Sequence, residues 1–210
     1  MLETMTEEEE AVGASAGEAR LSGWKQELRS DLDEALATGG GRWSRAVAAI
    51  AWIHLAVFLA AQAIYDPNSP RDPRHLLLWL AEFAGILVAL RLIAGRGWVR
   101  SSAAIALVTR FWGTFLILSF NVVSLNELMG WEMRWYRPAW GTVSSFFLAS
   151  MGWLFTPKMF IPAVQMYFTA LLMLRYRDYD NLIYGISWWL ALMGIAARLR
   201  RRERGEPGRA

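Results

Sequence analysis

Apolar residues gather in six long stretches that short polar segments separate. A helix of about 20 apolar residues is long enough to cross the hydrocarbon core of a bilayer. The predicted spans are residues 45–64, 75–94, 101–123, 139–155, 159–174 and 182–197. The pattern predicts an all-α, polytopic integral membrane protein, with one helical bundle over residues 42–198 and about six transmembrane helices.

The connections between the apolar stretches bear on the number of spans. Only Thr156, Pro157 and Lys158 separate the fourth stretch from the fifth, so these two segments are predicted to form a tight antiparallel hairpin. A hairpin that crosses the bilayer completely gives six spans. A re-entrant hairpin gives five.

The segment before the first span divides into two parts. Residues 1–20 are acidic, small and polar, and this composition predicts a disordered arm. Over residues 21–41, Trp24, Leu28, Leu32 and Leu36 recur every four residues and predict an amphipathic helix that ends at a glycine run. This helix either lies on the membrane surface or packs on the base of the bundle.

Composition strengthens the membrane interpretation. Hydrophobic residues make up 55% of the 210 residues, and the chain holds 12 Trp. A soluble domain of this length is rarely so apolar. The chain has no cysteine, which excludes disulfides, thiolate nucleophiles and cysteine-ligated metal sites.

Charge predicts the orientation in the membrane. The basic tail, residues 199–210, and Arg198 before it carry an arginine cluster, and arginine is enriched in cytoplasmic segments. We therefore expect a multi-pass protein of the plasma membrane with both termini in the cytoplasm. The cluster from Arg198 to Arg204 serves as a topology anchor or attracts anionic lipid.

Three ionisable residues lie near the middle of the first three spans: His54, Glu82 and Arg110. A charge at mid-membrane is costly and is retained with a partner or a function. Two interpretations follow. In one, Glu82 and Arg110 form a fixed salt bridge. In the other, they form a switchable pair, and His54 exchanges protons with it.

Further polar residues follow on the third span. Asn121, Asn126 and Glu127 lie toward its outer end, where they line an outer vestibule or form hydrogen bonds between helices. Small residues on the later spans, among them Ser144 and Gly185, suggest positions of close helix packing.

Chemical motifs are missing from the chain. It contains no phosphate-binding glycine loop, dinucleotide fingerprint or hydrolase motif. The second histidine, His75, lies at a different depth from His54, which disfavours a haem held by two histidines. We predict no catalytic residues, no cofactor, no metal site and no nucleic-acid partner.

The sequence leaves three classes of function open. A non-catalytic accessory subunit or scaffold of a membrane complex is slightly favoured, with other membrane subunits or further copies of the chain as partners besides the bilayer. The alternative is a small transporter or proton-coupled module centred on His54, Glu82 and Arg110. The third is a membrane enzyme that acts on lipid. A polar cleft that reaches His54 or Glu82 supports transport or chemistry, whereas a closed centre supports a scaffold.

Overall fold

The structure is a computed structural model that describes residues 2–66, 73–128 and 136–204. For residues 2–16, 73, 126, 127 and 136 it describes the backbone alone. The α-helices of the described residues are α1 (Leu2–Ala37), α2 (Arg42–Ala63), α3 (Pro73–Ile93), α4 (Ala103–Leu128), α5 (Tyr136–Leu154), α6 (Phe160–Arg175) and α7 (Asp180–Glu203). Three single-turn 3₁₀ helices, η1 (Trp98–Arg100), η2 (Pro157–Met159) and η3 (Arg177–Tyr179), precede α4, α6 and α7.

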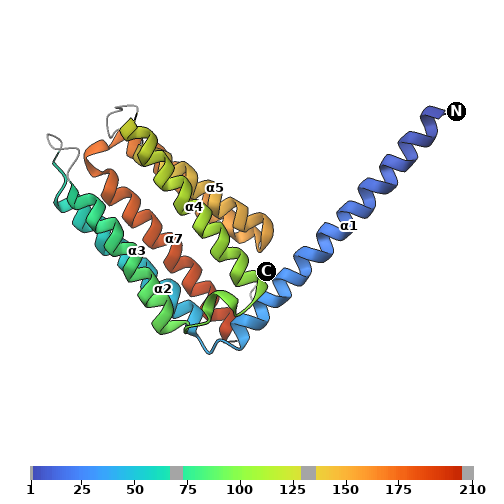
Figure 1. Cartoon of the computed structure of the whole chain (residues 1–210), viewed down its shortest axis with the longest axis horizontal. Coiled ribbons are helices and arrows are strands. Elements are labelled where there is room, and N and C mark those ends of the chain that lie inside the picture. Colours follow the sequence, from blue (N-terminus) through green and yellow to red (C-terminus); the bar gives the residue numbers. More distant parts are fainter. Residues whose placement is uncertain (1, 67–72, 129–135, 205–210) are drawn as a thin grey trace.

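The bundle consists of two groups of helices. Helices α2, α3 and α7 lie side by side, with α2 packed on both of its neighbours, and we call them the α2/α3/α7 layer (Figure 1). Helices α4, α5 and α6 form the other group, in which α5 packs on α4 and α6. The two groups are joined chiefly where α6 packs on α7.

The predicted helical membrane bundle is confirmed. Five helical segments of the described residues are long and apolar enough to cross a membrane: Arg42–Ala63, Arg74–Ile93, Ala103–Leu125, Pro157–Arg175 and Arg177–Glu203. Helix α5 does not reach this apolar character because Arg137 and several Ser and Gly residues interrupt it. The predicted hairpin is also present, since α5 and α6 pack along each other on either side of η2.

Helix α1 differs from the sequence prediction at its start. The helix begins at Leu2, whereas residues 1–20 were expected to be disordered. The physical reason is local propensity, because Ala, Glu and Met are among the best helix formers. Toward its other end, Leu28 and Leu36 are buried against the bundle, while Trp24 stays 44% exposed. This part of α1 therefore packs on the base of the bundle.

Two carboxylates from distant segments cap helix starts at this base. Asp31 of α1 accepts a hydrogen bond of 2.7 Å from the backbone N–H of Ala104, at the beginning of α4. Glu203 of α7 accepts one of 3.2 Å from the N–H of Ser44, at the beginning of α2. The first N–H groups of a helix have no partner within the helix, and a negative charge there is favourable. These contacts fix α1 to α4 and α7 to α2.

Close contact between α2 and α7 depends on a missing side chain. A Cβ at Gly185 would lie 2.6 Å from the Cβ of Phe58, so only glycine fits there. A Cβ at Gly194, on the same helix, would have no atom of another element within 4 Å. Of these two α7 glycines, Gly185 is the position of close packing.

We predict opposite effects of alanine at these two glycines. Gly185→Ala forces α2 and α7 apart and should destabilise the protein by about 1–3 kcal/mol. Gly194→Ala should be neutral or stabilise the protein by up to about 1 kcal/mol, because alanine favours helix more than glycine does. The measurement is thermal or denaturant unfolding in detergent. Equal losses in the two variants would contradict the packing of α2 on α7.

Candidate functional site

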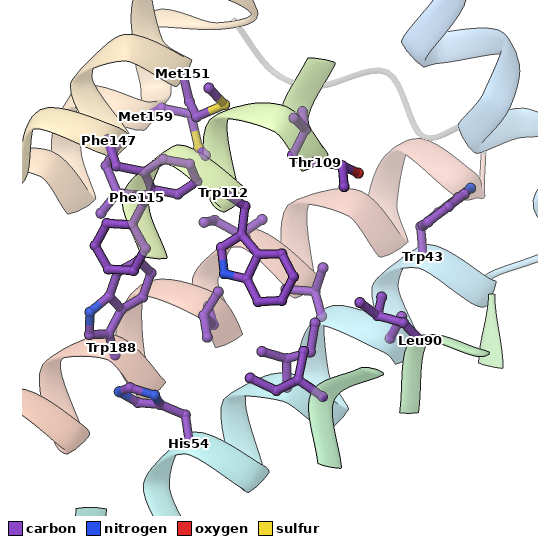
Figure 2. Close-up of a pocket in the computed structure, with 18 of the residues that line it drawn as sticks. Trp43, His54, Leu90, Thr109, Trp112, Phe115, Phe147, Met151, Met159 and Trp188 are labelled. Atoms are coloured by element: carbon purple, nitrogen blue, oxygen red, sulfur yellow. The ribbon is translucent and has the colours of Figure 1, made fainter. Parts of the chain in front are cut away.

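A large cavity lies between the α2/α3/α7 layer and the helices α4 and α5. Its volume is about 1130 Å³, which exceeds the range of about 300–1,000 Å³ common for small-molecule sites. Most of its lining is apolar, with aromatic rings from α4, α5 and α7 on one part of its wall (Figure 2). The cavity lies in the middle of the bundle and extends to one of its ends.

Aromatic side chains separate the two groups of helices around this cavity. Trp112 of α4 stacks on Phe83 of α3 with 6.0 Å between ring centroids. Phe115 of α4 meets Trp188 of α7 at 5.9 Å. Because whole rings stand between α4 and the α2/α3/α7 layer, the helix backbones cannot approach closely, and an open volume remains between them.

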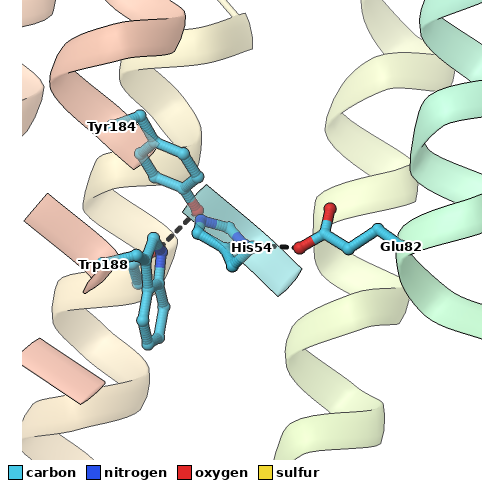
Figure 3. Close-up of polar contacts among 5 residues, drawn as sticks. His54, Glu82, Tyr184 and Trp188 are labelled. Carbon is cyan, nitrogen blue, oxygen red and sulfur yellow. Dashed lines mark hydrogen bonds and ion pairs between the residues drawn. The ribbon is translucent and has the colours of Figure 1, made fainter. Parts of the chain in front are cut away.

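His54 and Glu82 meet on the cavity wall. His54 projects from α2 and Glu82 from α3, and a hydrogen bond joins His54 Nδ1 and Glu82 Oε1 (Figure 3). Their side chains are 13% and 14% exposed, and both line the cavity. An ionised carboxylate only accepts hydrogen bonds, so when Glu82 is ionised the proton of this hydrogen bond lies on Nδ1.

The second ring nitrogen of His54, Nε2, is the atom of the pair that is free to bind another molecule. Nε2 is buried and has no hydrogen-bond partner within the part of the chain that the structure describes. With the proton on Nδ1, a neutral imidazole presents a lone pair at Nε2. A buried polar atom without a partner costs free energy. The pair can therefore accept a proton or a hydrogen bond from a molecule beside it.

Aromatic rings and one serine complete the surroundings of His54. Its ring lies 4.4 Å from that of Phe58, 5.8 Å from that of Tyr184 and 6.0 Å from that of Trp188, between centroids. Ser144 Oγ lies 2.8 Å from the Tyr184 hydroxyl and accepts a hydrogen bond of 3.2 Å from Trp188 Nε1. This network fixes Tyr184 and Trp188, and through them the wall against which His54 packs.

Arg110, expected to pair with Glu82, lies elsewhere. Its side chain is exposed on α4, and no described residue forms an ion pair or hydrogen bond with it. Its helical neighbours Thr109 and Trp112 line the cavity. One residue turns a helix by about 100°, so Arg110 points away from Glu82. The carboxylate pairs with His54 instead, which corrects the Glu82–Arg110 hypothesis.

The predicted outer vestibule is described only in part. Asn121 is exposed on α4 and does not line the cavity. The side chains of Asn126 and Glu127 lie outside the described residues. The vestibule therefore stays a prediction.

A buried ion pair that sequence reasoning missed lies at the far end of the bundle. Arg137 Nη1 donates to Asp180 Oδ1 at 2.5 Å, and the two side chains are 2% and 8% exposed. The guanidinium also lies 4.9 Å from the ring centroid of Tyr65. The sequence pattern assigned both charges to connecting loops. Their position directly before apolar stretches was the available signal, since a helix start can carry such charges into the bundle.

Comparisons of the chain with protein-family models, curated proteins and solved structures gave no match.

A double-mutant cycle tests the partnership of His54 and Glu82. Removing one partner leaves the other buried and unpaired, so His54→Gln and Glu82→Gln should each destabilise the protein. The double variant should lose less than the sum of the two, with a coupling free energy of about 1–3 kcal/mol. The measurement is unfolding in detergent.

Arg110 provides the matched control for this cycle. Glu82→Gln and Arg110→Gln should add within about 0.5 kcal/mol, because the two side chains do not touch. Additivity at His54–Glu82 together with coupling at Glu82–Arg110 would contradict the observed pairing.

Proposed function

We propose that this protein is a small proton-coupled module of the plasma membrane, which binds a molecule in the central cavity and exchanges a proton at the His54–Glu82 pair. The observation that carries the proposal is the cavity of about 1130 Å³ that reaches both side chains. Histidine is the side chain best suited to gain and lose a proton near neutral pH. Ionisable groups inside membrane bundles commonly mark substrate or proton pathways.

In this proposal α5 is the sixth span, although among the described bundle helices it alone lacks a segment apolar enough to be recognised as a span. Three of its polar side chains, those of Arg137, Ser144 and Ser145, contact other helices. Ser145 Oγ donates to the carbonyl of Ala163 on α6 at 2.8 Å, and Ser144 contacts Tyr184 on α7. Arg137 is 98% buried by its pair with Asp180. Helix α5 can therefore cross the bilayer without exposing these groups to lipid.

The two ends of the cavity differ in charge. Lys158, Arg198, Arg201 and Arg202 line one end, which we call the basic end. Lys158, Arg201 and Arg202 are exposed there, so the cavity has a route to the aqueous phase. By the preference of arginine for the cytoplasmic side, this end faces the cytoplasm. At the opposite end of the bundle, the buried Arg137–Asp180 pair joins the starts of α5 and α7.

The same observations bear on the other classes of function. A scaffold that works only through its outer surface needs no cavity, and a closed centre is the more stable arrangement of apolar side chains. A lipid-directed enzyme needs a reacting group beside His54, and no described Ser or Thr side chain is hydrogen-bonded to it. The proton-coupled module is the class that uses both the cavity and the pair.

One-sided access to the cavity tests the proposal. The natural chain has no cysteine, so in a single-cysteine variant all labelling comes from the introduced thiol. Thr109 lines the cavity, and Thr114 lies on the exposed face of the same helix. A membrane-impermeant methanethiosulfonate should label Thr109→Cys from the cytoplasmic side and not from the outside, because the thiol reacts through its water-exposed thiolate.

Thr114→Cys is the matched control and should stay unlabelled from both sides, since its face of α4 contacts lipid. Failure to label Thr109→Cys from either side would mean a dry, closed centre, and the proposal would be abandoned in favour of a scaffold.

A further inference from the structure

We infer that the molecule bound in the cavity is an anionic lipid, with its phosphate at the basic end and an acyl chain along the aliphatic wall between that end and the His54–Glu82 pair, which leaves His54 Nε2 open for proton exchange. This inference rests on the proposed function and names the class of ligand. Two features of the cavity wall carry it: the separation of charge from apolar surface along the cavity, and the sign of that charge.

Positive charge is concentrated at one end of the cavity. The Lys and Arg residues of the described lining lie there: Lys158, Arg198, Arg201 and Arg202. Arg198 is held in place by a hydrogen bond of 2.9 Å from its Nη1 to the carbonyl of Lys158, which brings α7 and the α5–α6 connection together. Arg202 is partly neutralised by Asp33, with 3.1 Å between Nη1 and Oδ1. A net positive cluster of this kind favours a phosphate group.

The rest of the cavity is built for a hydrocarbon chain. Between the basic end and the His54–Glu82 pair the wall is formed by aliphatic side chains from several helices. These include Ile50, Ile86, Leu90, Val108, Leu192 and Ile195. Glu82 is the one acidic residue of the described lining. It belongs to α3 and lies away from the cations of the basic end. A freely soluble anion would leave this apolar surface uncovered, whereas an acyl chain would cover it.

The bundle also offers a side route from the bilayer. Phe83 of α3 and Trp112 of α4 stack across the gap between these two helices, and Phe83 is 39% exposed. A pair of side chains is easier to part than two packed helices. A lipid can enter there with its chain in the membrane and its phosphate at the level of the cytoplasmic headgroups.

Fluorescence quenching of the protein by brominated lipids tests the inference. The intact protein is placed in phosphatidylcholine nanodiscs, and dibrominated phosphatidic acid or dibrominated phosphatidylcholine is added in small amounts. Trp43, Trp112 and Trp188 line the cavity, so a chain inside it quenches them. Phosphatidic acid should quench at concentrations about tenfold lower than phosphatidylcholine, in line with the strength of charge-assisted binding to several cations.

Charge variants distinguish lipid binding in the cavity from general attraction of anionic lipid to the basic tail. Lys158→Gln and Arg201→Gln should each weaken the response to phosphatidic acid by about fivefold, the factor expected for one cation beside an anionic headgroup. Arg200→Gln removes the same charge from a neighbouring residue that does not line the cavity. It should change the response by less than about twofold. Equal effects of Arg200→Gln and Arg201→Gln would overturn the inference.

A cavity-filling variant separates chain binding from headgroup binding. Thr109→Phe should weaken the selective quenching, because its ring takes up part of the chain's path, and Thr114→Phe should leave it unchanged. Selective quenching that is unchanged by Thr109→Phe would place the lipid on the surface and overturn the inference. Inorganic phosphate at the concentration of the lipid should not compete, and competition would point to a free phosphate ligand instead.

The outcomes also separate this inference from the proposed function. If both brominated lipids quench equally while Thr109→Cys is still labelled from the cytoplasm, the cavity is open but its ligand is not an anionic lipid. If Thr109→Cys is unlabelled, the proposed function fails as well.

Discussion

The separation of α4 from the α2/α3/α7 layer is the constraint on which the rest of the structure depends. Rings of Phe83, Trp112, Phe115 and Trp188 stand between the two groups, and each ring occupies space that a closer helix pair would exclude. Elsewhere the same bundle packs tightly, as at Gly185 against Phe58. The bundle therefore combines tight helix packing at one place with a cavity at another, and the bulky rings hold the helices apart at the cavity.

The cavity makes the His54–Glu82 pair accessible to a bound molecule. In a packed centre the pair would be a buried structural hydrogen bond, and apolar replacements of similar size would stabilise the protein about as well. Beside an open volume, its Nε2 atom, which has no partner among the described residues, is available to a molecule that enters. Tyr184 and Trp188, held by Ser144, fix the other wall of the site. The geometry thus places the hydrogen-bonded pair beside a largely apolar open space.

Several parts of this arrangement follow from the sequence. The length and composition of the apolar stretches predict the membrane bundle, and the three-residue connection predicts the α5–α6 hairpin. The pattern also identifies His54 and Glu82 as costly residues that need partners. It could not identify which partner each has, because helix rotation decides this. Arg110 lies at a depth suitable for Glu82, yet it points away from the cavity that its neighbour Thr109 lines.

Other parts depend on contacts between distant segments. The capping of α4 by Asp31 and the burial of Arg137 with Asp180 join residues far apart in the chain. Neither has a local sequence pattern. The cavity itself is a property of how rings from α3, α4 and α7 meet, which no single helix reveals. The start of α1 shows the opposite case, in which local helix propensity outweighs an acidic composition that suggested disorder.

The stability of a cavity-filling variant tests most directly whether α4 stands apart from the layer. Thr109 and Thr114 both donate their hydroxyl to the carbonyl four residues earlier, at 2.8 and 3.0 Å, so replacement by Phe removes the same bond at each. If the cavity is open, the free energies of unfolding of Thr109→Phe and Thr114→Phe in detergent should agree within about 0.5 kcal/mol. A loss of about 1–3 kcal/mol at Thr109 alone, the usual cost of overpacking a filled core, would contradict the account.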